Sequence, residues 1–350
     1  MDQQDSIVTQ VKAALDDCRP LAIQGGNSKV FYGYPAQGDS LDVSEHSGIV
    51  EYDPGELVIT CRAGSLLADI RSTLKENGQH LPFEPPAFGE RATIGGTVSC
   101  GLSGPRRPWS GSLRDYLLGV KMVNGSGAVV RYGGQVMKNV AGYDVSRLVA
   151  GSMGTLGVML EVSFKVLPVP ARELTLGFEC DQTEAIRRIN EWAGQPLPLS
   201  GAFWSHGRLQ VRLSGAQTET GRAAKRLQAD QVSENPQTWL ELREQQSDFF
   251  TEPGDLWRLS LPPATEPLDL GGDCLVDWGG AQRWIRTPQP AEEIREQAAR
   301  SGGHATLFKG KGNGARFHPL PPELEQLHKR IKQAFDPHGL FNPFRMSRNW

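Results

Sequence analysis

The chain has 350 residues, which is long enough for two domains with separate hydrophobic cores. Its 37 basic and 40 acidic residues leave a net charge of −3, which argues against a nucleic-acid-binding surface. No stretch approaches the roughly 18 consecutive apolar residues of a membrane span, and the acidic start MDQQD is unlike a signal peptide. These features predict a cytoplasmic protein with no membrane span and no nucleic-acid partner.

In the first half of the chain, the spacing of apolar residues predicts a mixture of helices and strands. Ile7, Val11 and Leu15 recur at helical spacing, and a second helix is predicted from Ser65, as its cap, to Gly78. The sequence NGSG predicts a hairpin turn between two strands. The predicted strands are residues 21–24, 48–52, 57–62, 117–123, 128–132 and 158–166. Two prolines at positions 168 and 170 then predict a domain boundary.

The second half of the chain begins with a β-α-β-β-α order, as in ferredoxin-like domains. Its predicted strands are residues 173–180, 202–204, 209–213, 256–261, 274–278 and 283–286. Its predicted helices are residues 184–192, 218–227, 235–250, 290–300 and 322–335. Asp336 and Pro337 are predicted to end the last of these helices.

Two glycine-rich segments are the most informative part of the sequence. AIQGGNS occupies residues 22–28, and ATIGGTVSCGLSG occupies residues 92–104. Glycine lets the backbone approach a ligand closely, and successive backbone N–H groups can form a concave site for phosphate-like anions. Neither segment has the Rossmann pattern, and the Gly-Lys at residues 310–311 lacks the Ser or Thr of a Walker A loop. The two segments together predict a diphosphate-containing ligand.

Four segments, in this order, resemble the flavoenzymes with a vanillyl-alcohol oxidase or PCMH-type FAD-binding domain. They are IQGGNS at 23–28, PFEPPAFGERATIGGTVSCGLSG at 82–104, SGSLRDYLLGVKMVNGSG at 110–127 and KNVAGYDVSRLVAGSMGTLGVMLEVSFKVLP at 138–168. The closing DPHGLFNPFRM at 336–346 is similar to the D-P-x-G-x-x-N-P tail of the 2-hydroxy-acid dehydrogenase branch. Within that branch the chain most resembles the FAD-binding subunits of bacterial glycolate oxidase.

The resemblance implies an α+β fold with three parts. A two-subdomain PCMH-type FAD-binding domain would span residues 1–170. A ferredoxin-like α+β cap, for substrate or subunit contacts, would span residues 171–320. A C-terminal helix and tail, residues 321–350, would return to the FAD-binding domain.

The resemblance also implies a set of cofactor-binding residues. Many members attach FAD covalently through a His in the first loop, but Asn27 and Ser28 stand where that motif would be, so non-covalent FAD is expected. Backbone amides of Gly25, Gly26 and Asn27 are expected to meet the diphosphate. The full expected set is Gln24, Gly25, Gly26, Asn27, Ser28, Pro85, Thr93, Ile94, Gly95, Gly96, Ser99, Gly101, Gly104, Gly157, Val158 and Asn342.

The catalytic residues are less evident, because the N-x-H-x-G-D-G-N-x-H stretch of relatives that oxidise lactate or glycolate is absent. Hydride loss from a 2-hydroxy acid needs a cation for the carboxylate and a base for the hydroxyl proton. His304, Arg316 and His318 are the candidates for these roles. The alternative interpretation of the same stretch is a solvated basic loop.

The expected function is therefore that of an FAD-binding subunit of a glycolate oxidase complex, which converts glycolate to glyoxylate. The expected partners are a second flavin subunit and an iron–sulfur subunit, with any association with the inner face of the membrane made through the complex. Five scattered cysteines without a C-x-x-C spacing fit reduced thiols and exclude an internal iron–sulfur cluster of that type. Two alternatives are an electron-relay subunit without a substrate site and a stand-alone FAD-dependent reductase.

Overall fold

The computed structural model describes residues 1–134, 144–312 and 314–350, and these residues form two compact units. The first unit comprises Met1–Ser103, Ser112–Val169 and Pro319–Trp350, and the second comprises Gly104–Gly111 and Pro170–His318. The chain thus enters the second unit twice, first for the short segment Gly104–Gly111. Among the described residues, no helix combines the length and apolar character needed to span a bilayer.

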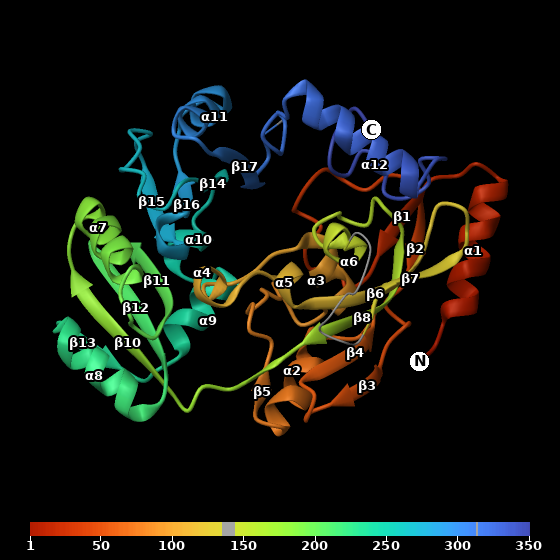
Figure 1. Ribbon diagram of the computed structural model, residues 1–350. Helices are drawn as coiled ribbons and strands as arrows, with labels where there is room; N and C mark the ends of the chain where they lie inside the picture. The colour runs from red at the N-terminus through yellow and green to blue at the C-terminus, as the bar shows by residue number, and fades with distance from the viewer. Residues whose placement is uncertain (135–143, 313) are drawn as a thin grey trace. The chain divides into compact units, whose positions relative to one another are not determined.

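A five-stranded sheet forms the centre of the first unit, with strand order β3-β4-β8-β6-β7 (Figure 1). Its strands are β3 (Ile49–Asp53), β4 (Val58–Arg62), β6 (Leu117–Val123), β7 (Val129–Gly133) and β8 (Val158–Lys165). All neighbouring strands in it are antiparallel. Apolar residues alternate along the central strand β8, at Val158, Leu160, Val162 and Phe164. Every residue from Val158 to Phe164 is buried, so the residues between them do not face solvent.

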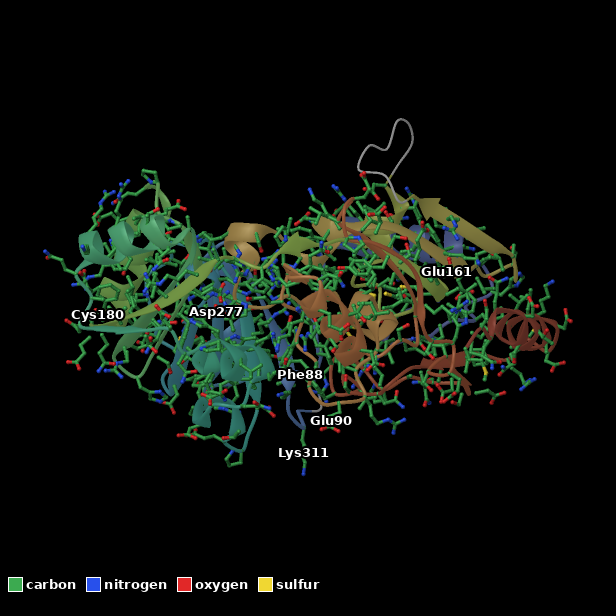
Figure 2. All side chains as sticks on the ribbon, turned by 90° about the horizontal axis from the view of Figure 1, so that it is seen from below. Phe88, Glu90, Glu161, Cys180, Asp277 and Lys311 are labelled. Atoms are coloured by element: carbon green, nitrogen blue, oxygen red, sulfur yellow. The ribbon has the colours of Figure 1, made fainter. Side chains whose placement is uncertain are left out.

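Ion pairs link β8 to β6 and to the strand beyond it, β7. Glu161, labelled in Figure 2, accepts hydrogen bonds from Lys121 on β6 at 3.0 Å and from Arg131 on β7 at 2.9 Å. The hairpin predicted at NGSG is present, because β6 and β7 pair directly on either side of it.

The first unit has two hydrophobic cores, which fits the expected two-subdomain organisation. One core packs α2 (Leu67–Glu76) and α3 (Ile94–Cys100) against the five-stranded sheet. The other packs α1 (Gln4–Asp16) and the C-terminal Leu340 and Phe341 against a parallel pair of strands. That pair is β1 (Leu21–Gln24) and β2 (Asp39–Asp42). The remaining elements are β5 (Gln79–His80), α5 (Leu113–Tyr116), α6 (Val145–Val149), β9 (Leu167–Pro168) and α12 (Pro322–Phe335).

An eight-stranded sheet forms the second unit, in the order β13-β10-β12-β11-β15-β16-β14-β17 (Figure 1). Its strands are β10 (Arg172–Glu179), β11 (Leu199–Ser205), β12 (Arg208–Gly215), β13 (Gln231–Ser233), β14 (Leu256–Ser260), β15 (Asp273–Asp277), β16 (Gln282–Arg286) and β17 (His304–Lys309). Its helices are α4 (Arg107–Ser110), α7 (Gln182–Ala193), α8 (Gln217–Leu227), α9 (Gln237–Glu244), α10 (Asp248–Thr251), the 3-10 turn η1 (Trp278–Gly280) and α11 (Ala291–Arg300).

The strand order confirms a ferredoxin-like arrangement and adds a second one. β10, β11, β12 and β13 have the spatial order fourth, first, third, second. β14 to β17 have the same relative order, and the two halves join where β11 pairs with β15. The sequence predicted only the first half, because β17 was interpreted as part of a basic loop.

Two helix predictions differ from the structure. Ser65 does not cap α2, because its hydroxyl accepts from Gly48 N at 2.9 Å and donates to Gly48 O at 3.0 Å. The helix predicted over residues 235–250 is divided into α9 and α10, because Gln245 at the end of α9 has a left-handed φ of 55°.

Candidate functional site

The first glycine-rich segment follows strand β1 and packs tightly against the second. A Cβ atom on Gly26 would lie 1.4 Å from the carbonyl oxygen of Arg91, and one on Gly25 would lie 2.7 Å from Oγ1 of Thr93. Asn27 has a φ of 56°, in the left-handed region that Asn tolerates. The side-chain Nδ2 of Asn27 donates a hydrogen bond to Oε1 of Gln24 at 3.1 Å. Glycine is therefore required at position 26 by packing against the backbone of Arg91, and at position 25 by packing against the side chain of Thr93.

The second glycine-rich segment is a helix over much of its length rather than a loop. Thr93 caps α3, and its Oγ1 accepts a hydrogen bond from Gly96 N at 3.3 Å. Gly95 faces Ala63, because a Cβ at Gly95 would lie 2.8 Å from that of Ala63. The helix ends at Gly101, which has a φ of 63°. Its glycines thus serve close packing and termination of a short helix.

The C-terminal tail joins these segments through Asn342. Its Oδ1 accepts from Ile23 N at 2.7 Å, and its Nδ2 donates to the carbonyl of Met153 at 2.7 Å. Its backbone N–H donates to Leu21 O at 2.9 Å, so the tail pairs alongside β1. Asn342 is therefore a link between β1 and the turn at 151–157.

A cavity of about 330 Å³ lies between these elements, entirely within the first unit. Eleven residues of the expected cofactor-binding set line it: Gln24, Gly25, Gly26, Asn27, Ser28, Thr93, Gly95, Gly96, Ser99, Gly157 and Asn342. These eleven residues come from four parts of the chain that are far apart in the sequence, at 24–28, 93–99, 157 and 342. The assignment of these residues to a cofactor stays a prediction.

Five residues of the expected set do not line the cavity. Ile94 and Val158 are fully buried in the two cores. Gly101 packs against Gly151, and the carbonyl of Pro85 accepts a hydrogen bond from Arg71. Gly104 belongs to the second unit, where its carbonyl accepts from Nε1 of Trp278 at 3.0 Å. The contacts of these five residues are with other parts of the protein, so no contact with a ligand is needed to account for the residue at each position.

The expected cofactor-binding set omits several residues that line the cavity, among them Lys29, Cys100, Met153 and Arg345. Cys100 ends α3, whereas Lys29 and Met153 lie in turns, whose geometry no motif spacing reveals. Lys29 and Arg345 are the cations among the described residues that line the cavity, and no Asp or Glu occurs in that group. Such a lining of glycines, polar donors and cations fits an anionic ligand such as a dinucleotide.

The three catalytic candidates lie in the second unit. His304 begins β17, and its ring centroid lies 6.4 Å from that of His318. Nδ1 of His318 accepts a hydrogen bond from Ala305 N at 3.4 Å, and Nη1 of Arg316 donates to Gly310 O at 2.9 Å. Partial loss of hydration lowers the pKa of both histidines, although the His304 side chain is still exposed at the start of β17, and the charge of Arg258 lowers the pKa of His304 further. Both rings are therefore neutral at neutral pH.

Part of the family resemblance falls outside the described residues. The KNVAGY portion of the fourth segment, residues 138–143, lies there. The described remainder of the fourth segment forms α6, the turn at 151–157 and β8.

Comparison with known proteins identifies the domain that contains this cavity. Residues 2–133 match the model of a family described as an FAD binding domain, so the first unit carries an FAD-binding domain. A solved structure of alkyldihydroxyacetonephosphate synthase has the same fold, with a TM-score of 0.69 at 13% identity over 97% of this chain and 74% of that one.

Two curated relatives define the family more closely. The chain is 49% identical to the glycolate oxidase subunit GlcE of Escherichia coli (strain K12), over 99% of this chain and 97% of the relative. It is 33% identical to the glycolate oxidase subunit GlcD of Bacillus subtilis (strain 168), over 45% of this chain and 34% of that relative. The chain belongs to the family of glycolate oxidase subunit GlcE.

Proposed function

We propose that this chain is the FAD-binding subunit of a glycolate oxidase complex, which oxidises glycolate to glyoxylate. The observation that carries the proposal is the cavity of the first unit, where two glycine-bearing segments and the C-terminal tail present polar donors and cations. A bound FAD would supply the two-electron acceptor for the hydride of the substrate. The backbone at Gly25, Gly26 and Asn27, with Ser28 and Thr93, would hold that cofactor without a covalent bond.

The proposed substrate residues are His304, His318 and Arg316. A neutral imidazole can take the hydroxyl proton as hydride leaves the α-carbon, and a guanidinium can hold the substrate carboxylate. The proximity of the two rings and the lowered pKa of each support the base role. Either ring can serve as the base, and the hydrogen bond from Ala305 N fixes the orientation of His318.

We propose that the chain works with a second flavin subunit and an iron–sulfur subunit. One supporting feature is an exposed apolar row on α12 and just before it, formed by Leu320, Leu324 and Leu327. Leu324 and Leu327 are 46% and 50% exposed, and an exposed apolar row of this kind is typical of a surface that contacts another protein. The double variant Leu324→Glu/Leu327→Glu should keep its fold and lose co-purification with the partners, and retained co-purification would remove α12 from the interface.

The proposed location is the cytoplasm, with any membrane association made by the partner subunits. All five cysteines are unpaired thiols in the structure, as expected of a reducing compartment. Electrons that reach this chain would leave through the partners.

A second candidate function is an electron-relay subunit that binds FAD and lacks a substrate site. The absence from the sequence of the histidine-rich stretch of the glycolate and lactate relatives favours it. The two candidates differ in whether glycolate reduces the flavin of the isolated chain.

Anaerobic addition of glycolate separates these functions. The experiment uses the purified chain alone and the complex co-expressed with its partners, and follows the bleaching of the visible flavin spectrum. Bleaching of the isolated chain, lost in His304→Gln and His318→Gln but kept in the exposed-turn control His206→Gln, supports the proposal. Bleaching only in the complex identifies a relay subunit, and protein that takes up no flavin contradicts both functions.

A further inference from the structure

Lys29 places a buried cation at the first glycine-rich segment. It follows Ser28 directly and is only 6% exposed, although lysine is rarely buried. Its Nζ donates to Ala87 O at 3.1 Å and to Oγ of Ser28 at 3.2 Å. The same Nζ lies 5.8 Å from the ring centroid of Phe88, which Figure 2 labels. These contacts fix the side chain of Lys29, a residue that lines the cavity.

Arg345 brings a second cation to the same cavity from the opposite end of the chain. Its guanidinium donates to the carbonyl of Tyr34 and, at 3.3 Å, to that of Val30. In return, Tyr34 N donates to Arg345 O at 3.1 Å. Arg345 therefore ties the C-terminal tail to the loop that begins at Lys29.

The charges of Lys29 and Arg345 both reach Cys100. Burial raises the pKa of its thiol, while the charges of Lys29 and Arg345 both oppose that rise. All three residues line the cavity. A ligand placed at this wall would therefore meet both positive charges.

A buried ion pair fixes the tail that carries Arg345. Nζ of Lys332 donates to Oδ2 of Asp336 at 2.5 Å, to Thr155 O at 2.7 Å and to Phe341 O at 2.8 Å. The carboxylate of Asp336 in turn accepts from the backbone N–H groups of Leu340 and Phe341. With Asn342 bonded to β1, Arg345 lies three residues beyond a firmly held point.

We propose that Lys29 and Arg345 bind the diphosphate of FAD, so that cofactor binding and docking of the C-terminal tail stabilise each other. The proposal rests on the proposed function of this site. Two cations and no acidic side chain, among the described lining residues, match the two negative charges of the diphosphate. Arg345 belongs to both the tail and the cavity. If docking of the tail strengthens cofactor binding, then cofactor binding stabilises the docked tail by the same free energy.

The test compares three ligands on the apoprotein. FAD and ADP both carry a diphosphate, whereas riboflavin carries the isoalloxazine without phosphate. Lys29→Gln and Arg345→Gln should each weaken FAD and ADP by the same factor, about 10- to 100-fold, and leave riboflavin unchanged. Lys29→Arg and Arg345→Lys should retain most of the affinity, and Arg330→Gln, on the exposed side of α12, should retain all of it.

Hydrogen exchange tests the coupling to the tail. Backbone amides of residues 340–346 should exchange more slowly when ADP is added, and Arg345→Gln should abolish that protection. Loss of FAD affinity with unchanged ADP affinity would overturn the proposal, because the charges would then serve the isoalloxazine. If the wild-type chain binds FAD tightly and both Gln variants bind it equally well, the assignment of Lys29 and Arg345 to the diphosphate is overturned, but the proposed function is not. A wild-type chain that binds neither FAD nor ADP would overturn the proposed function as well.

Discussion

Single glycines in the first unit are required mainly because backbone packs against backbone. Gly26 is the most constrained, since any side chain there would collide with the carbonyl of Arg91. The collision involves main chain on both sides, so no flexible side chain can move away. This contact holds the two glycine-rich segments together at the edge of the cavity.

Gly26→Ala should therefore destabilise the first unit by about 1–3 kcal/mol and weaken FAD binding. The matched control is Gly194→Ala at the end of α7, where a Cβ would meet nothing closer than 3.6 Å. Thermal unfolding and FAD titration of both variants check this prediction. A Gly26→Ala protein with wild-type melting temperature and wild-type FAD affinity would contradict the packing described here.

At the histidines of the second unit, protonation and folding are linked. The folded pKa of His304 and of His318 is lowered, so below the ordinary pKa near 6.5 the unfolded chain binds more protons than the folded chain. Their contribution to stability is therefore present at higher pH and is lost as the pH falls through that range.

The free energy of unfolding should accordingly fall between about pH 7.5 and pH 5.5. His46, unlike these two residues, is fully buried, and its pKa is lowered as well, so it contributes to the same trend. The informative quantity is the difference between the parent and His304→Gln/His318→Gln, measured by urea unfolding at each pH. The double variant should lose less stability on acidification, and an identical loss would show that these two rings do not titrate as described.

Among the elements, α12 depends on one buried contact. Lys332 is the buried residue of this helix, and the Asp336 carboxylate that it meets is fully buried. The pair has the i, i+4 spacing of an ordinary surface salt bridge, but it binds four additional backbone groups.

Asp336→Ala should destabilise the first unit by about 3–5 kcal/mol, because it leaves a buried ammonium without its carboxylate. Glu296→Gln removes the exposed i, i+4 pair with Arg300 and should cost less than about 0.5 kcal/mol. Denaturant unfolding curves measure both. Equal effects of the two substitutions would mean that the tail does not depend on the buried pair.

The elements also mark where sequence reasoning succeeds. β1 and α12 have the predicted bounds, because a short apolar run and a proline start with an Asp-Pro stop are local signals. The glycine-rich sequence of α3 indicates a loop, because glycines disfavour helices. The structure has a helix there, which Thr93 caps and in which the absence of a side chain at Gly95 leaves room for Ala63. Lys29 has no local signal of its role, because tertiary contacts alone bring it to the cavity.

For the whole molecule, the sequence indicated the number of units better than their exact composition. The predicted boundary near the prolines coincides with the division between Val169 and Pro170. The segment Gly104–Gly111 could not be assigned from sequence, since it is short and flanked by the first unit on both sides. It belongs to the second unit because Arg106 pairs with Glu173 and Trp278 donates to Gly104.

The central claim, that the first unit binds one FAD without a covalent bond, is tested most directly by the flavin content of the purified chain. The protein is saturated with FAD, freed of excess cofactor and denatured, and the released flavin is identified by chromatography and counted against protein. The account predicts one equivalent of intact FAD in the soluble fraction. Flavin that stays attached to the denatured chain would contradict non-covalent binding, and a colourless chain that retains no FAD would contradict the site itself.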